Sequence, residues 1–240
     1  MASQDQAMPT APSTSGAGLL TAAAWVLVCL LAAGFIYKYV FHYYLHFDAK
    51  SFDVYWPRRA GLLVHISAGM VALAIGPLQF WTGLKARLPR VHRWMGRIYL
   101  VAVAAGSAAG LYMAATTTFG WAFGFALAML AVAWAGSAAI AYTAILNGAV
   151  TLHRRWMVRA YVVTFAFVIF RLFQDWLPTS HIKPPQDFAV ADAWGCWVIP
   201  LMITIAIQEL GDVRRQGRRR PGRACVAPGG GCRPTPGWRR

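Results

Sequence analysis

Apolar residues along this chain fall into six long runs that are separated by short polar segments. A helix needs about 20 apolar residues to cross the hydrocarbon layer of a bilayer, and each run reaches or approaches that length. The runs cover residues 18–41, 60–82, 96–116, 119–146, 156–177 and 193–210. The pattern therefore predicts an all-α, polytopic membrane helix bundle with about six transmembrane helices.

The two ends of the chain lack this pattern. Residues 1–17 are small, polar and rich in Pro and Ser, whereas residues 212–240 are rich in Arg, Gly and Pro and have no apolar period. Segments of this composition bury too little apolar surface to fold alone. We therefore predict a six-span membrane domain over residues 18–211, between a disordered N-terminal tail (1–17) and a disordered C-terminal tail (212–240).

One motif occurs twice. Residues 91–99 read VHRWMGRIY and residues 152–161 read LHRRWMVRAY, so that His, Arg, Trp, Met, Arg and Tyr recur in one order with one inserted residue. Each copy opens a long apolar run. This repetition predicts that spans two to five form a duplicated four-helix core, which brings His92 and His153 to the same depth.

Composition and charge support a membrane protein and exclude other classes. With 58% hydrophobic and 13% charged residues among 240, the chain is too apolar for an ordinary soluble domain. The net charge of +15 does not indicate nucleic-acid binding, because the basic residues lie in short loops and in the C-terminal tail. The arginines of that tail could contact anionic lipids.

Most Lys and Arg residues lie in the loop before the third span, in the loop before the fifth span and in the C-terminal tail. Cytoplasmic loops carry an excess of such residues, so we predict that both motif copies and both termini face the cytoplasm. The predicted location is the bacterial cytoplasmic (inner) membrane.

The two motif histidines are candidate cofactor ligands. A neutral imidazole can bind haem iron axially, and nearby arginines can neutralise the haem propionates. His92 with Arg93 and His153 with Arg154 offer these groups, so haem b is a candidate cofactor with His92 and His153 as its metal ligands. In the alternative, each His-Arg pair lies in the headgroup layer and contacts lipid phosphate.

A second polar set lies at the opposite side. His65 lies about one turn inside the second span, and Arg171 and Asp175 lie at matching depth in the fifth. The i,i+4 spacing of Arg171 and Asp175 predicts an ion pair that holds the helix packing. The alternatives are a second haem held partly by His65, a quinone head group bonded by His65 and Arg171, or a proton relay. The fourth span contains no histidine, which argues against a complete two-haem site.

The second span also carries a stripe of small residues. His65, Gly69, Ala72, Gly76 and Gln79 recur at steps of three and four, and therefore share one face of a helix. Small residues on such a face let a neighbouring helix, or a flat ligand, approach closely.

His42 and His46 stand at i,i+4 with Asp48 close behind, a spacing that suits a divalent metal, and His181 could complete the site. The alternative is an interfacial aromatic belt, since the segment reads HYYLHF. The chain has no glycine loop for phosphate, no Ser or Cys nucleophile elbow and no HExxH motif, so the sequence does not indicate an enzyme class.

Several of these motifs together carry a family resemblance. They are His65, GPLQF at 76–80, HRWMGRIY at 92–99, HRRWMVRAY at 153–161 and TFAFVIFRL at 164–172. Over roughly residues 60–210 the chain resembles a bacterial family of predicted membrane proteins that is defined only as a domain of unknown function. The resemblance implies a multi-span inner-membrane protein and no established reaction.

A weaker likeness, in four central helices with paired histidines, is to the membrane b-type cytochromes, which pass electrons between two bis-histidine haems. This chain departs from their pattern because His65 has no evident partner and His92 and His153 lie shallow. The leading hypothesis is a b-type haem protein in membrane electron transfer. The competing classes are a haem-free transporter, lipid-binding or membrane assembly protein, and a sensor or scaffold that uses the arginine-rich tail.

Overall fold

The computed structural model describes residues 16–85, 88–179 and 188–219, which form helices joined by short turns and contain no strand. The helices are α1 (Gly16–Phe35), the π-helix η1 (Ile36–Val40), α2 (Phe41–Leu45), α3 (Ala49–Phe52), the 3-10 helix η2 (Asp53–Arg58), α4 (Arg59–Lys85), α5 (Pro89–Ala115), α6 (Trp121–Leu146), α7 (Val150–Thr164), α8 (Ala166–Thr179) and α9 (Phe188–Arg219).

Within this part of the chain, six helical stretches are long and apolar enough to cross a membrane. They are Gly18–Leu45, Ala49–Gly83, Pro89–Ala115, Trp121–Leu146, Val150–Trp176 and Phe188–Gln216. The predicted all-α membrane bundle of about six spans is thereby confirmed. The first, second and fifth stretches each join several helices end to end, because the backbone changes its helix type or kinks within them.

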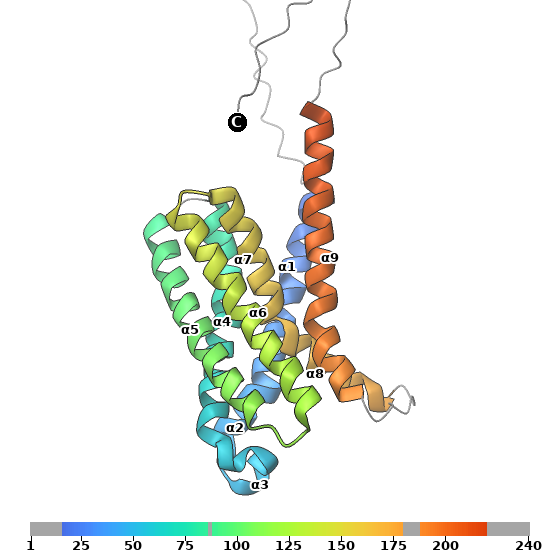
Figure 1. Cartoon of the computed structure of the whole chain (residues 1–240). Helices are drawn as coiled ribbons and strands as arrows, with labels where there is room; N and C mark the ends of the chain where they lie inside the picture. The colour runs from blue at the N-terminus through green and yellow to red at the C-terminus, as the bar shows by residue number, and fades with distance from the viewer. Residues whose placement is uncertain (1–15, 86–87, 180–187, 220–240) are drawn as a thin grey trace, which may run out of the picture. The chain divides into compact units, whose positions relative to one another are not determined.

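The centre of the fold is a four-helix bundle of α4, α5, α6 and the α7–α8 pair (Figure 1). Each helix packs on the next along the chain, and α7 closes the ring by contacting α4. The short connections make neighbouring helices antiparallel. The bundle thus consists of two hairpins, α4–α5 and α6–α7, as the sequence repeat predicts, and α1 packs along α4 and contacts α8.

The bundle core combines small residues with a few large aromatic rings. Ala72, Ala126 and Ala160 are fully buried, and Tyr99 lies among them at 1% exposure. At such positions the absence of a large side chain lets the backbones approach, which is how membrane helices gain packing energy. Gly106 is one example, because a Cβ atom there would lie 2.8 Å from the ring of Trp134.

A compact cap covers the end of the bundle at which α4 begins. Arg58 is buried and donates hydrogen bonds to the carbonyl oxygens of Val54, at 2.9 Å, and of Thr116, the residue that ends α5. A guanidinium group at a helix C-terminus satisfies free carbonyls and interacts well with the helix dipole. Phe52 is also fully buried there, where its ring packs against Tyr43 and other aromatic side chains.

Asp48 begins the short helix α3. Its carboxylate accepts hydrogen bonds from the backbone amides of Ser51 and Lys50, both at 2.9 Å. The Ser51 amide and hydroxyl, together with the Lys50 amide, hold the pKa of the Asp48 carboxyl below its usual range. This N-cap fixes the turn that connects the first two spans.

The chain divides into two compact units, residues 1–205 and 206–240, and α9 begins in the first and ends in the second. In the second unit, α9 continues to Arg219, past residue 211, where the sequence predicts that the membrane domain ends. Residues 1–15 and 220–240 of the two predicted tails lie outside the described residues.

Candidate functional site

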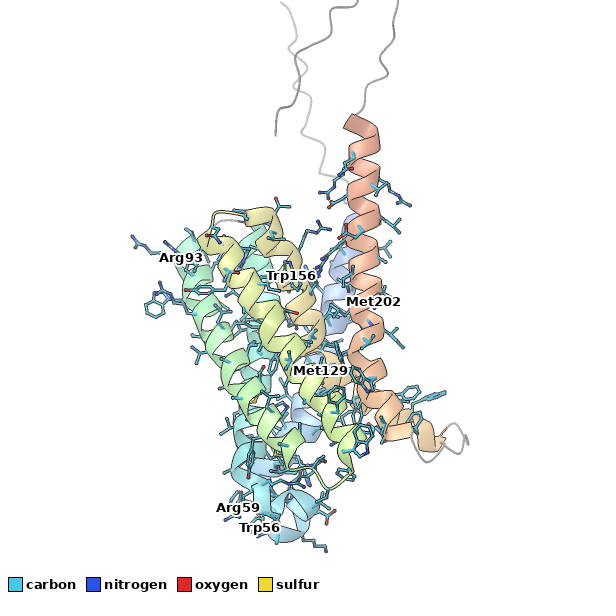
Figure 2. All side chains as sticks on the ribbon, viewed as in Figure 1. Trp56, Arg59, Arg93, Met129, Trp156 and Met202 are labelled. Carbon is cyan, nitrogen blue, oxygen red and sulfur yellow. The ribbon has the colours of Figure 1, made fainter. Side chains whose placement is uncertain are left out.

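The four-helix bundle has two ends that differ in chemistry. We call the end at which α5 and α7 begin the motif end, which contains His92 and His153. We call the opposite end, which contains His65 and Arg171, the cavity end. Figure 2 shows Arg93 and Trp156 toward the motif end and Trp56 and Arg59 at the cavity end.

At the motif end, each motif histidine closes its own hairpin. The His92 Nδ1 atom lies 3.1 Å from the Thr82 hydroxyl oxygen at the end of α4, and that hydroxyl also contacts the Leu78 carbonyl oxygen. The His153 Nδ1 atom lies 2.8 Å from the Ala141 carbonyl oxygen of α6. The His153 ring therefore donates from Nδ1 to the preceding helix, whereas the direction of the His92–Thr82 hydrogen bond depends on the tautomer of His92.

A second shared contact confirms the duplication of the core. The Arg97 guanidinium lies over the Trp94 ring at 5.1 Å, and the Arg159 guanidinium lies over the Trp156 ring at 4.6 Å. Both are cation–π contacts between residues three positions apart, one turn beyond each motif histidine. The two motif copies thus fold alike despite the residue inserted in the second.

The remaining predicted ligands of the motif end are only partly assembled. His92 and His153 are both half-buried and lie within electrostatic range of one another, on helices that face each other across the bundle. Arg93 and Arg154 are exposed, and Arg93 donates to the Pro89 carbonyl of its own helix at 3.3 Å. Haem ligation by this set stays a prediction.

One buried acceptor at the motif end has no partner. The Gln79 side-chain nitrogen donates to the His92 carbonyl oxygen at 2.9 Å, but its Oε1 atom is buried without a hydrogen bond among the described residues. Buried polar atoms are nearly always satisfied, so such an atom indicates space for a water or a ligand group.

The cavity end contains a cavity of about 180 Å³. Its walls come from α4 to α8 and from the end of α1, η1, α2 and η2, and most of the lining is apolar or aromatic. The polar side chains that line it are Tyr39, Tyr43, Tyr55, His65, Thr164 and Arg171. The cavity thus brings together His65 and Arg171, which the sequence assigns to one polar site. His92 and His153 do not line it.

His65 is fixed in the wall of this cavity. Its Nδ1 atom lies 2.8 Å from the Gly106 carbonyl oxygen, and a carbonyl can only accept, so Nδ1 carries a proton. The ring packs edge-on against Trp134, at 6.4 Å between centroids, and Phe167, at 5.9 Å. Its Nε2 atom has no hydrogen bond within the described part of the chain and in the neutral ring is a free acceptor.

A buried hydrogen-bond network closes the cavity on the side of the motif end. The Thr164 hydroxyl donates to the Ala160 carbonyl at 2.9 Å and accepts from the Trp134 indole at 2.8 Å and the Tyr99 hydroxyl at 3.0 Å. One donated and two accepted bonds satisfy a hydroxyl completely. Thr164 therefore binds three helices together and has no capacity left for a ligand. It also lies at the kink between α7 and α8.

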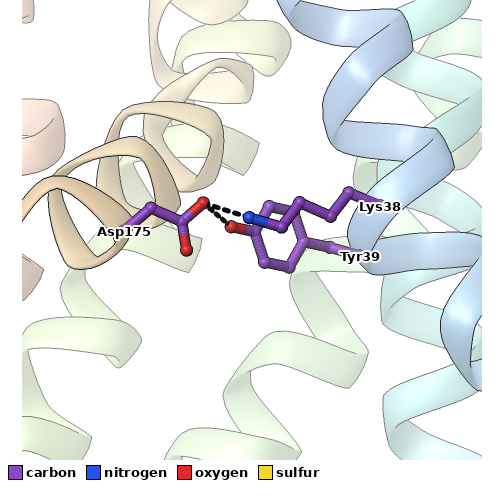
Figure 3. A network of polar contacts seen from close by, with 3 residues as sticks. All are labelled: Lys38, Tyr39 and Asp175. Carbon is purple, nitrogen blue, oxygen red and sulfur yellow. Dashed lines mark hydrogen bonds and ion pairs between the residues drawn. The ribbon is translucent and has the colours of Figure 1, made fainter.

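The predicted ion pair between Arg171 and Asp175 is wrong. Asp175 instead pairs with Lys38 of η1 at 2.6 Å and accepts a hydrogen bond from the Tyr39 hydroxyl (Figure 3). The Arg171 guanidinium lies over the rings of Tyr39, at 5.4 Å, and Phe170, at 6.0 Å. In the described residues it has no ion pair and no hydrogen bond.

Lys38 and Tyr39 are functional candidates that the sequence analysis missed. They belong to the π-helix η1, a rare local geometry that often marks functional sites. Figure 3 shows both side chains reaching toward Asp175 from the same helix. Opposite charges in two apolar runs, Lys38 in the first and Asp175 in the fifth, are a sequence signal for pairing between helices. The sequence analysis instead paired Asp175 with Arg171, because Arg171 is its i,i+4 neighbour.

The structure gives no support to a metal site at His42 and His46. Their rings lie together, at 5.0 Å between centroids, but the Asp48 carboxylate caps α3. No group of three or more His, Cys, Asp or Glu residues that could hold a metal ion occurs within the described ranges. His181, the third predicted ligand, lies outside them.

The comparisons with known proteins agree with this picture of a membrane bundle. No curated protein and no solved structure matches the chain. The model of the family described as Predicted membrane protein (DUF2306) matches residues 62–207, from the first turn of α4 into α9, and so includes the four-helix bundle, both motif histidines, His65 and Arg171. The chain therefore belongs to this family of predicted membrane proteins.

Proposed function

We propose that this protein binds a small lipid-soluble molecule inside the membrane, in the cavity of about 180 Å³ at the cavity end. The observation that carries the proposal is that His65 and Arg171, from two different helices, line one cavity and each keep polar capacity that the protein does not use. Apolar pockets with a few convergent polar groups are typical ligand sites. Ionisable residues within spans commonly mark such sites.

The size of the cavity limits the ligand. A dry cavity of roughly 150 Å³ in another protein accommodates benzene, whereas sites for drug-sized ligands occupy roughly 300 to 1,000 Å³. The present cavity therefore suits one ring with small substituents, or the head of a longer lipid, and is too small for a porphyrin.

Gly69 offers a direct test of this proposal. It lines the cavity, and a Cβ atom placed there would have no neighbour within 4 Å. Gly69→Leu should therefore fill the cavity without a clash in the bundle. Gly136→Leu is the matched control, because Gly136 on α6 is equally open but does not line the cavity.

The experiment compares the molecules that copurify with each protein. Wild type and both variants are purified from native membranes, extracted with solvent and analysed by mass spectrometry. We expect a small apolar compound that copurifies with wild type and with Gly136→Leu and is lost from Gly69→Leu. A bound compound that is recovered in equal amount from all three proteins would refute the proposal.

A second candidate function rests on the motif end. His153 donates Nδ1–H to the Ala141 carbonyl, and His92 contacts the Thr82 hydroxyl through Nδ1, so neither contact uses Nε2. Metal-binding histidines are usually oriented by a hydrogen bond of the other ring nitrogen. We propose that the pair can ligate one b-type haem, with Arg93 and Arg154 near its propionates. Haem would supply one-electron transfer chemistry there.

A reduced-minus-oxidised visible spectrum of the purified protein, expressed with ample haem, tests this second candidate. The b-type signal should be lost in His92→Ala and in His153→Ala. His65→Ala is the matched control, since His65 has the same Nδ1 bonding but lies at the other end. A folded, colourless wild-type protein, or a signal that survives in both motif variants, would contradict haem binding at this pair.

We also propose that the motif end faces the cytoplasm of a bacterial cell, because Arg97 and Arg159 with their tryptophan partners suit the anionic headgroups of that leaflet. A green fluorescent protein fused after residue 240 should then fluoresce, and an alkaline phosphatase fused there should be inactive. The opposite pair of results would reverse the orientation.

A further inference from the structure

We propose that the ligand of the cavity is a quinol of the benzoquinone class, whose two ring oxygens contact His65 and Arg171. This inference rests on the proposed ligand site and names the chemistry of its occupant.

The cavity offers one acceptor and one cation from two helices, α4 and α8. His65 cannot accept at Nδ1, which donates to the Gly106 carbonyl, so the neutral ring offers Nε2 as an acceptor for a ligand hydroxyl. The Arg171 guanidinium lies over the rings of Tyr39 and Phe170, and the Asp175 carboxylate one turn away acts on it electrostatically. It has no ion pair or hydrogen bond within the described residues, so its N–H groups can donate to a ligand oxygen. The complementary ligand therefore carries a hydroxyl that can donate to His65 and an oxygen that can accept from Arg171.

The other polar side chains in the cavity wall differ in whether they can still bond to a ligand. Thr164 is saturated by three hydrogen bonds, and the Tyr39 hydroxyl donates to Asp175. Tyr43 and Tyr55 belong to the segments that follow α1 and border the cap. Their hydroxyl groups have no hydrogen bond among the described residues, so they are two further polar groups of the wall. Within the four-helix bundle itself, His65 of α4 and Arg171 of α8 are the polar wall residues with unused capacity.

The residues that line the cavity leave room for an aromatic ring beside His65. Gly69 leaves one wall open, since a Cβ atom there would have no neighbour within 4 Å. Trp134 and Phe167 stand edge-on against His65 and present aromatic surface beside it. A volume of about 180 Å³ holds one substituted benzene ring, with any long substituent outside.

The ligand should thus have a hydroxyl donor, an oxygen acceptor and the size of one ring. A hydroquinone has all three, because it is a single flat ring with two hydroxyl groups. Its oxidised form, the quinone, keeps both oxygens as acceptors but has no hydroxyl to donate. The geometry therefore predicts that His65 distinguishes the two forms, whereas Arg171 contacts both.

The test uses tetramethyl-1,4-benzoquinone and its quinol as probes, without a lipid tail, in anaerobic equilibrium dialysis against the full-length protein in detergent. His65→Phe keeps the ring contacts but removes the acceptor. We expect it to weaken quinol binding about tenfold, the value of one hydrogen bond, and to leave quinone binding nearly unchanged. Arg171→Met should weaken binding of both forms, and Gly69→Leu should abolish it.

Several results would overturn the quinol assignment. One is an equal loss of quinol and quinone in His65→Phe, and another is wild-type quinol binding in Gly69→Leu. A third is tighter binding of decanoate than of the quinol, lost in Arg171→Met, which would identify a carboxylate site instead. Gly136→Leu must bind as wild type does, which excludes a general effect of a leucine in the bundle.

Failure of this inference is separable from failure of the proposed function. If a compound copurifies with wild type, is lost in Gly69→Leu and contains no quinone ring, the cavity is a ligand site and the quinol assignment falls. If nothing copurifies but the quinol probe binds in the predicted pattern, the quinol assignment stands.

Discussion

Both ends of the bundle contain a histidine that is hydrogen-bonded through Nδ1, but the surroundings of this histidine differ between the two ends. At both ends the partner lies on a neighbouring helix, and the contact does not use Nε2. At the motif end this contact closes a hairpin, with Gln79 packed beside it. At the cavity end His65 forms part of a cavity wall.

The duplication of the core therefore does not extend to a duplicated site. From α6, the ring that faces His65 belongs to Trp134, whose indole nitrogen donates to Thr164. An indole does not bind iron, so the cavity end lacks the second ligand that a bis-histidine haem requires. The repeat therefore preserves helix packing at the motif end, while the cavity end has diverged.

The largest expected effect comes from the glycine stripe of α4. Gly76 is buried, and a Cβ atom there would collide with the ring of Tyr161, whose hydroxyl is held by the Leu73 carbonyl. Gly76→Ala should destabilise the protein by about 1 to 3 kcal/mol, the usual cost of overpacking. Gly69→Ala, seven residues away on the same stripe, should be close to neutral. Thermal unfolding in detergent measures the stability of both variants. An equal loss of stability would contradict the difference between the packed position Gly76 and the open position Gly69.

A somewhat smaller effect is expected at the network between the two ends. Thr164→Val removes the acceptor of the Tyr99 hydroxyl and of the Trp134 indole. The cost should be about 1 to 2 kcal/mol, because interhelical hydrogen bonds in membranes contribute less than the packing of the same helices. Thr143→Val is the control, since the Thr143 hydroxyl bonds only to the Ile140 carbonyl of its own helix. An unchanged Tm for Thr164→Val would mean that the network does not couple the helices.

The fold was largely predictable from the sequence because a membrane simplifies the problem. Apolar length alone predicts each span, and the repeated motif predicts the hairpins. The start of each motif helix agrees as well, since α5 and α7 begin three residues before His92 and His153. The π-helix η1 was not predictable, because its residues IYKYV read as an ordinary helix.

The candidate site was predictable only in part. The depth of His65 and Arg171 follows from residue counting along their helices, so their placement in one polar region was a sound inference. The partner of Asp175 was predicted wrongly, because i,i+4 spacing is visible in a sequence and a contact with Lys38, 137 residues away, is not. The network of Thr164 was missed for the same reason, since each of its bonds to a ring crosses to another helix.

Exchange of charges tests the contact that the sequence analysis missed. Lys38→Asp and Asp175→Lys should each lower the Tm modestly, less than Thr164→Val does, because the pair is exposed. The double variant should recover most of the loss, since it restores the opposite charges in reversed order. If Arg171 were the true partner, Lys38→Asp would have little effect and the double variant would be no better than Asp175→Lys alone.

The smallest expected effect is the response to acid of Asp48, in the cap segment that also contributes Tyr55 to the cavity. Hydrogen bonds from the Ser51 amide and hydroxyl and the Lys50 amide lower the pKa of the Asp48 carboxyl in the folded protein. A carboxyl group with a lowered pKa stabilises the folded state fully above its unfolded pKa of about 3.9, and this stabilisation is lost as the pH falls through the folded value.

Below about pH 4 the amides of Lys50 and Ser51 should therefore exchange faster, relative to their intrinsic rates, whereas the helix starts at the motif end should not change. Asp48→Asn caps a helix equally well but does not titrate, so its exchange should be independent of pH in this range. A pH response that persists in Asp48→Asn would assign the acid sensitivity to another group and leave the cap without a role in it.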